Sequence, residues 1–217
     1  LGNKRAHLRS TRTWRISLNK AMELLGRVAA PGAKLFTLVF VLDGTRVLLG
    51  MKKRGFGVGL WNGFGGKVEP NESVRAAARR ELQEESGIDV DEEDLTRRAM
   101  LRFEWRSEER DEIPLSDRVP PFSVNVYTVT RFRGLPVESE EMRPQWCNVD
   151  DVPYGTMWED DQYWLPQILE SDAAACVGLF RFASPSGGSE MLSNEIEVLS
   201  SVTLLPSTPT GGVLPFT

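Results

Sequence analysis

Residues 65–88 read GGKVEPNESVRAAARRELQEESGI, and this stretch decides the fold prediction. Two glycines open it, and a run of helix-forming residues begins at about Ser73. Gly87 follows that run, at the position where glycine commonly ends a helix. The stretch therefore predicts a glycine-rich loop followed by a helix from Ser73 to Ser86.

Three glutamates of this helix are expected to share one face. At about 100° per residue, Glu81, Glu84 and Glu85 lie at i, i+3 and i+4, on a stripe that apolar residues normally fill. The small or apolar residues on the same side are Val74, Ala77 and Ala78. The opposite side, expected to face solvent, holds Arg75, Arg79, Gln83 and Ser86.

This placement of the glutamates is unfavourable without a counter-charge. Their like charges repel one another, and Glu84 and Glu85 lie in the last turn, where the helix dipole disfavours anions. A carboxylate cluster without His or Cys is the ligand set of a hard cation. The spacing therefore predicts a site for Mg²⁺ or Mn²⁺, and a solvated run of charges is the alternative.

Strand patterns flank the helix on both sides. Residues 35–42 are apolar and β-branched, Asp43-Gly44 marks a hairpin turn, and residues 45–51 return as a second strand. Six glycines between positions 55 and 66 predict a sharply bent loop. Further strands are expected at 99–105, 124–132, 177–182 and 191–198, and a second helix at 163–171. This order predicts an α/β (α+β) domain with a mixed β-sheet between helices.

The expected folded domain spans residues 35–199. Residues 1–34 carry eight Lys or Arg and one acid, which is typical of a mitochondrial or plastid targeting segment. The alternative is upstream sequence without function, with Met22 as the start. Residues 200–217 are rich in Ser, Thr, Pro and Gly and are expected to form a disordered tail. The polar segment 106–121 is expected to be an exposed loop insertion.

The composition excludes several kinds of chemistry. The single histidine, His7, lies in the N-terminal extension, so His triads, His metal sites and His bases are not expected in the folded part. Cys147 and Cys176 cannot form a disulfide framework, which is typical of a cytoplasmic protein. No apolar run is long enough to cross a bilayer. Beyond residue 34 acids exceed bases by 12, which argues against a nucleic-acid-binding surface.

The central stretch also resembles a known family signature. Gly66, Glu72 and the run RELQEESGI at 80–88 fill every fixed position of the Nudix box. The resemblance implies the Nudix fold and divalent-metal-dependent hydrolysis of a nucleoside diphosphate linked to another group. The longer stretches GMKKRGFG (50–57), WNGFGGK (61–67), ESEEMRP (138–144) and WEDDQYW (158–164) resemble Nudix enzymes that act on oxidised purine nucleoside triphosphates.

The resemblance assigns roles to residues of the box. The metal ligands that it implies are Glu81, Glu84, Glu85, the carbonyl of Gly65 and the distant Glu141. The catalytic residues that it implies are Arg80, Glu81, Glu84 and Glu85. Arg80 is expected to pair with a neighbouring glutamate and orient it, with an ordinary surface arginine as the alternative. Glu72 is either an acid that complements the helix start or a support for the ligands.

The resemblance implies a purine site as well. Asn62 offers a donor and an acceptor to a purine edge, and Trp158 offers a stacking surface. Asp160 and Asp161 cannot both ionise cheaply, so one is expected to keep its proton and help read both 8-oxoguanine and 2-hydroxyadenine. The alternative is an Asp pair that caps a helix. The full set expected to bind substrate is Thr37, Lys52, Asn62, Phe64, Gly65, Gly66, Lys67, Trp158, Glu159, Asp160 and Asp161.

The predicted function is that of a Mg²⁺-dependent pyrophosphohydrolase. It would convert 8-oxo-dGTP and 2-hydroxy-dATP to the monophosphate and pyrophosphate, which keeps damaged precursors from a polymerase. The alternatives are another Nudix substrate, such as a methylated purine nucleotide, a dinucleotide or a nucleotide sugar, and a non-catalytic module that senses a nucleotide. The expected partner is a free nucleoside triphosphate, with no nucleic acid, no membrane and a monomeric protein.

Overall fold

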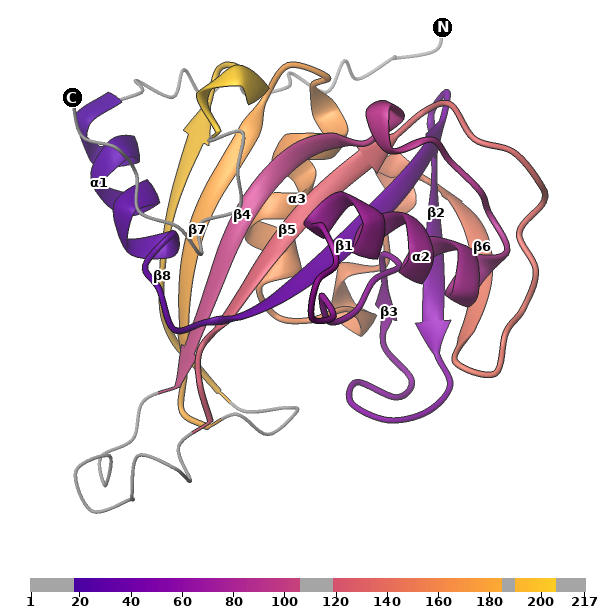
Figure 1. Cartoon of the computed structure of the whole chain (residues 1–217), viewed down its shortest axis with the longest axis horizontal. Helices are drawn as coiled ribbons and strands as arrows, with labels where there is room; N and C mark the ends of the chain where they lie inside the picture. Colours follow the sequence, from indigo (N-terminus) through magenta and orange to yellow (C-terminus); the bar gives the residue numbers. More distant parts are fainter. Residues whose placement is uncertain (1–17, 106–118, 185–189, 206–217) are drawn as a thin grey trace, which may run out of the picture.

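An eight-stranded mixed sheet forms the centre of the computed structural model, which describes residues 18–105, 119–184 and 190–205 (Figure 1). Its strands are β1 (Lys34–Asp43), β2 (Arg46–Lys52), β3 (Trp61–Asn62), β4 (Thr96–Trp105), β5 (Phe122–Val129), β6 (Met142–Asn148), β7 (Ala175–Phe182) and β8 (Met191–Leu199). The helices are α1 (Leu18–Val28), α2 (Val74–Ser86) and α3 (Asp161–Glu170). Short 3-10 turns lie at Glu92–Asp94, Val149–Asp151, Tyr154–Thr156 and Val202–Leu204. The predicted fold class is confirmed.

The strand order is β3-β2-β1-β5-β4-β7-β8. The β1–β5 and β4–β7 pairs are parallel and the other pairs are antiparallel. β2 pairs with β6 along its length, while its other edge pairs first with β1 and then with β3. This arrangement brings the end of β2, the glycine-rich loop and the segment before β6 together at one end of the sheet.

The predicted hairpin between the first two strands is confirmed. Asp43 pairs with Arg46, so Gly44 and Thr45 form a two-residue loop. Gly44 has φ +60°, a conformation that the primed hairpin turns require and that glycine adopts without a steric cost.

Helices cover both faces of the sheet (Figure 1). α3 packs on one face, where Trp164 and Leu165 join a core that includes Phe40, Leu101 and Phe180. α2 packs on the other face, where its apolar residues meet alternate residues of β1 and β5. The period-two alternation of the strands therefore supplies two separate cores.

A buried arginine fixes the far end of α3. Arg98 on β4 is 2% exposed and donates hydrogen bonds to the carbonyls of Ile168, Ser171 and Ala174. These carbonyls lie at and just beyond the C-terminal end of the helix, where backbone acceptors lack helical partners and a cation is favoured. The contact holds α3 against β4. The aspartate pair lies at the other, N-terminal end of the same helix.

The folded unit extends past both limits predicted for the domain. α1 packs on β4, β7 and β8 on the same side of the sheet as α2, and its buried residues are Ala21, Leu24, Leu25 and Val28. Arg27 makes a two-pronged ion pair with Glu195 of β8. At the other end Leu205 is buried in the same cluster, so a disordered tail from residue 200 is wrong for residues 200–205. The targeting role of residues 1–34 stays a prediction.

Several predicted element limits also shift. β5 runs from Phe122 to Val129 instead of 124–132, and α3 begins two residues before the predicted helix. β6 was not predicted: its Pro144 weakens the strand pattern, but β6 pairs with β2 alone, where a proline is tolerated. The predicted insertion at 106–121 falls largely on residues outside the described ranges. None of the described helices has the length and apolar character that a bilayer crossing requires.

Candidate active site

The helix that carries the glutamates is fixed at both ends. Ser73 Oγ accepts a hydrogen bond from Ala76 N at 3.0 Å, which caps the N-terminus. Gly87 has φ +75°, and its N–H donates to the carbonyl of Gln83. Both caps agree with the predicted helix limits, and they set the direction in which the glutamates project.

The three glutamates differ in exposure. Glu85 is buried at 4% exposure, Glu81 is half-buried, and the side chain of Glu84 is 60% exposed. Of the three glutamates predicted to face inward, Glu85 does so fully and Glu81 partly, while Glu84 faces solvent. Ser86, expected on the solvent face, is fully buried, and its Oγ donates to the carbonyl of Leu82 at 2.7 Å.

Glu85 is held between the glycine loop and β2. The N–H of Gly65 donates to its Oε2 at 2.8 Å, and Lys52 Nζ donates to its Oε1 at 3.0 Å. Burial raises the pKa of Glu85 above its ordinary value, and the charge of Lys52 and the Gly65 hydrogen bond offset only part of that effect. The carboxylate thus sits in a site that favours additional positive charge.

Arg80 connects the other glutamates of the box. Its Nε donates to Glu72 Oε1 at 2.9 Å, and its Nη1 donates to Glu81 at 2.8 Å and to Glu84 at 3.2 Å. Burial raises the pKa of Glu81, while the hydrogen bond from Arg80 lowers that of Glu72. These contacts favour an orienting role for Arg80 and a supporting role for Glu72, and both roles stay predictions.

Glu141 joins the cluster from the segment before β6. Lys52 donates to its Oε2 at 2.9 Å and Arg54 donates to its Oε1 at 2.8 Å. These cations lower the pKa of the Glu141 carboxyl, chiefly through the hydrogen bond from Lys52. The predicted distant acid is thus brought to the box, although it lies far from the box in the sequence.

The donor set fits a hard divalent cation. Glutamate oxygens from α2 and from the β6 segment gather beside the glycine loop, with no His or Cys among them. Within the described residues, no three acidic, His or Cys side chains already stand in the arrangement of a metal site. Lys52 and Arg80 instead pair with these carboxylates, so their charge is balanced by side chains of the protein.

Glycine is required where the loop passes the cluster. A Cβ on Gly65 would lie 2.0 Å from the carbonyl oxygen of Thr37 on β1. A Cβ on Gly66 would lie 2.5 Å from Oε1 of Glu81. The loop backbone therefore approaches both the sheet and the carboxylates as closely as only glycine allows.

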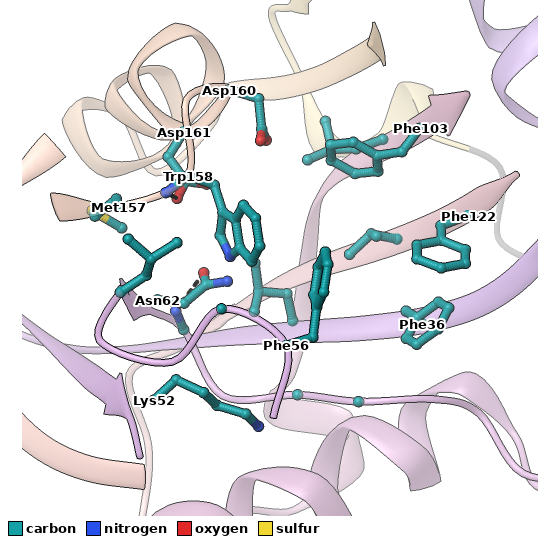
Figure 2. Close-up of a pocket in the computed structure, with 18 of the residues that line it drawn as sticks. Phe36, Lys52, Phe56, Asn62, Phe103, Phe122, Met157, Trp158, Asp160 and Asp161 are labelled. Carbon is teal, nitrogen blue, oxygen red and sulfur yellow. Dashed lines mark hydrogen bonds between the residues drawn. The ribbon is translucent and has the colours of Figure 1, made fainter. Parts of the chain in front are cut away.

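The cluster borders a cavity of about 810 Å³ (Figure 2). Lys52, Glu141 and the two loop glycines contribute to its wall, and Glu85 contacts two of these, Lys52 and Gly65. The aromatic residues of its wall are Phe36, Phe56, Phe103, Trp105, Phe122, Trp158, Trp164 and Phe182. A cavity with a charged border and an aromatic body suits a ligand with a flat ring and an anionic tail.

Trp158 and Phe56 face each other in the cavity, as Figure 2 shows. Their ring centroids are 4.8 Å apart and their planes differ by 23°. Gly57, with φ +82°, lets the loop approach closely, because a Cβ there would lie 2.6 Å from the Trp158 ring. Asn62 also lines the cavity, and its Oδ1 accepts a hydrogen bond from Gly63 N, which fixes the orientation of its amide.

Asp160 and Asp161 are buried side by side at the start of α3. Asp160 Oδ2 accepts from Trp164 Nε1 at 3.0 Å, and Asp161 Oδ2 accepts from Trp158 N at 3.1 Å. Burial raises the pKa of Asp160 to about 6, and burial together with the charge of Asp160 raises the pKa of Asp161 well above its ordinary value. Burial therefore disfavours ionisation of both side chains. Asp160 makes no capping bond to the helix, which argues against the capping alternative.

The other residues predicted to bind substrate divide into two groups. Thr37 and Glu159 line the cavity. Phe64 is fully buried in the core beneath α2, and Lys67 is exposed outside the cavity, so the structure does not place these two at the cavity.

Sequence reasoning missed part of the wall. Phe36 and Phe182 were not predicted, although each lies on a strand in the alternation that points toward α3. Arg54, which holds Glu141, was also missed, and its position next to Lys52 and Lys53 gave the only available signal.

Comparisons with known proteins agree with this geometry. Residues 34–168 match the family described as NUDIX domain. The chain is 44% identical over 167 residues to an oxidized purine nucleoside triphosphate hydrolase of Danio rerio, covering 77% of this chain and 98% of that protein. It is 46% identical over 138 residues to the protein of the same name from Mus musculus, covering 64% and 81%. A crystal structure of a MutT protein from Bacillus halodurans superposes with a TM-score of 0.61 at 25% identity, covering 75% of this chain and 97% of that one.

Proposed function

The chain belongs to the Nudix hydrolase family, and from this premise we propose that it is a Mg²⁺-dependent pyrophosphohydrolase of oxidised purine nucleoside triphosphates. The reaction would yield the nucleoside monophosphate and pyrophosphate, and so remove damaged precursors from the nucleotide pool. One observation carries the proposal. Glu141 of the carboxylate cluster and its partner Lys52 line the same cavity as Asn62, Trp158 and the aspartate pair.

The cluster provides the residues that would hold the metal ion. These are Glu81, Glu84, Glu85 and Glu141, with the Gly65 carbonyl beside them. A bound Mg²⁺ offsets the charge of phosphate oxygens and polarises phosphorus toward attack by water. Arg80 keeps Glu81 and Glu84 oriented, and Glu85 receives the Gly65 N–H on one oxygen. A carboxylate can accept the proton of the attacking water, so a chain without a histidine in its folded part suffices.

The other end of the cavity would select the base. A protonated Asp161 can donate a hydrogen bond and an ionised Asp160 can accept one, which gives the pair two different hydrogen-bonding atoms. The amide of Asn62 provides another donor, and Trp158 provides a stacking face. A purine edge with both donors and acceptors matches this arrangement. We propose a free nucleotide as the partner and a monomer as the acting form.

The product assay tests the proposal directly. With 8-oxo-dGTP and Mg²⁺, the expected products are 8-oxo-dGMP and pyrophosphate, and EDTA is expected to abolish turnover. The kcat/KM for dGTP is expected to be lower by a factor of about ten or more, because the unmodified base leaves part of the site unpaired. Release of orthophosphate, or equal turnover of the two nucleotides, would contradict the proposed substrate. Thermal stabilisation by nucleotide without any hydrolysis would indicate a sensing module instead.

The glycine next to the cluster offers a separate test. Gly66→Ala is expected to lower kcat by about 10- to 100-fold, because the new Cβ displaces Glu81 from the cluster. The free energy of unfolding is expected to change by less than about 2 kcal/mol, since a side chain and not backbone must move. Gly155→Ala is the control, because no atom lies within 4 Å of a Cβ there. Equal kcat values for the two variants would show that Glu81 need not stay in place.

A further inference from the structure

A lysine ammonium lies between two of the proposed metal ligands. Lys52 Nζ lies 3.0 Å from Oε1 of Glu85 and 2.9 Å from Oε2 of Glu141. These two carboxylates come from α2 and from the segment before β6, and both are proposed metal ligands. The ammonium is therefore the group that joins the two halves of the ligand set.

The other charged groups at this point leave Lys52 in a distinct position. Arg54 approaches Glu141 from the exposed side through the other carboxylate oxygen, and Arg80 pairs with Glu81 and Glu84 on the far side of the cluster. Lys52 alone, among the described cations, contacts both Glu85 and Glu141. Its partner Glu85 is 5% exposed, so this pair is poorly screened by solvent.

The backbone of Lys52 is fixed by hydrogen bonds, but its side chain can move into the cavity. The N–H of Lys52 donates to the Leu60 carbonyl and its own carbonyl accepts from Gly59 N, which anchors the end of β2. The side chain lines the cavity, so a four-carbon stem can carry the ammonium away from the glutamates without a backbone change. An anionic phosphate in the cavity would give it a new partner.

We propose that Lys52 is a tethered counter-ion that holds the place of the divalent cation between Glu85 and Glu141 and competes with it until a nucleotide binds. The inference rests on the proposed function. Two cations cannot share the space between carboxylates about 3 Å away, because their repulsion at such short range is strong, most of all beside the buried Glu85. Metal binding must therefore displace the ammonium, and the polyphosphate that accepts it makes metal and nucleotide bind cooperatively.

Mn²⁺ binding without nucleotide tests the competition. In electron paramagnetic resonance titrations of the whole chain, Lys52→Met is expected to bind Mn²⁺ about tenfold more tightly than the unmodified protein. Lys53→Met is the matched control, since it removes the same charge from the next residue, whose ammonium pairs with Glu138 instead. Its affinity is expected to change by less than about twofold at roughly 0.1 M salt. Lys52→Gln is a second variant in case Lys52→Met misfolds, and it is also expected to bind Mn²⁺ more tightly than the unmodified protein. Circular dichroism verifies that each variant is folded.

Two results would overturn the inference in different ways. If both Lys52 variants are folded and bind Mn²⁺ no more tightly than Lys53→Met, Lys52 does not compete, while the proposed enzyme stands on its product assay. If neither the variants nor the unmodified protein binds Mn²⁺, the proposed divalent-metal site is wrong, and the inference about Lys52 is wrong as well.

Cooperativity is tested with a dGTP analogue that carries a methylene group between the α- and β-phosphates. The analogue is expected to tighten Mn²⁺ binding by a larger factor in the unmodified protein than in Lys52→Met, because only the former must release an ammonium. Equal factors in the two proteins would contradict the coupling.

Discussion

Replacing Glu85 with glutamine is expected to lower kcat by about 10³-fold, the loss typical of removing a central charged group from such a site. Glu85 is the most buried carboxylate of the cluster and contacts both the glycine loop and Lys52. Glutamine keeps the shape and can still accept from Gly65 N, but it lacks the charge that would hold a divalent ion. The measurement is steady-state hydrolysis of 8-oxo-dGTP across a range of Mg²⁺ concentrations.

Glu138→Gln is the control for this variant. Glu138 lies three residues from Glu141 and pairs with Lys53 on the surface, so the same chemical change there is expected to alter kcat by less than about twofold. The Glu85 variant is expected to fold, because it loses a carboxylate whose burial is unfavourable. A folded Glu85→Gln protein that retains more than a tenth of the activity would contradict the assignment of Glu85.

The aspartate pair is expected to make base selectivity depend on pH. Burial raises the pKa of Asp160 to about 6, so Asp160 becomes an acceptor for a purine N–H as the pH rises through 6. The ratio of kcat/KM for 8-oxo-dGTP to that for 2-hydroxy-dATP is expected to change by about 10- to 100-fold between pH 5 and 8, the worth of a hydrogen bond to a charged group. The ratio is the useful measure, because titration of the glutamate cluster affects both substrates alike.

Asp160→Asn is expected to flatten this ratio, because an amide does not titrate. A raised pKa in the folded state means that the folded protein binds more protons than the unfolded one between about pH 4 and 6, so stability is lost as pH rises through that window. Asp160→Asn removes this loss and is expected to raise the free energy of unfolding at pH 7.5 by about 1–3 kcal/mol. Should Asp160→Asn and Asp161→Asn both keep the selectivity and its pH dependence, the aspartates do not read the base.

Local sequence signals predicted the catalytic helix well. The limits of α2 followed from a glycine stop and a run of helix formers. Helical spacing predicted the inward facing of Glu85 and in part of Glu81, but not the exposure of Glu84. Ser86 was misplaced because a helical wheel shows one helix in isolation. The segment after β5 covers this end of α2, where Val137 N donates to the Ser86 carbonyl and Ser139 Oγ donates to that of Glu85.

Other features depended on contacts that the sequence did not reveal. β6 was missed because Pro144 breaks the strand pattern, and only the edge position of β6 makes that proline acceptable. The helix that buries Ala21, Leu24, Leu25 and Val28 was not predicted, because the basic composition around it favoured a targeting segment. The pairing of Lys52 with Glu141 joins residues 89 positions apart, and no local pattern predicts such a contact.

The packing of α1 on the sheet limits where a protease can cleave the N-terminal segment without exposing the core. Cleavage at residue 34 would uncover Met100, Val177 and Leu179 and leave an apolar patch that promotes aggregation. Cleavage before Leu18 would spare the contacts of α1 with β4, β7 and β8. An import signal in the basic segment would therefore have to be cleaved upstream of this helix, and the processed enzyme would retain α1 in its folded domain.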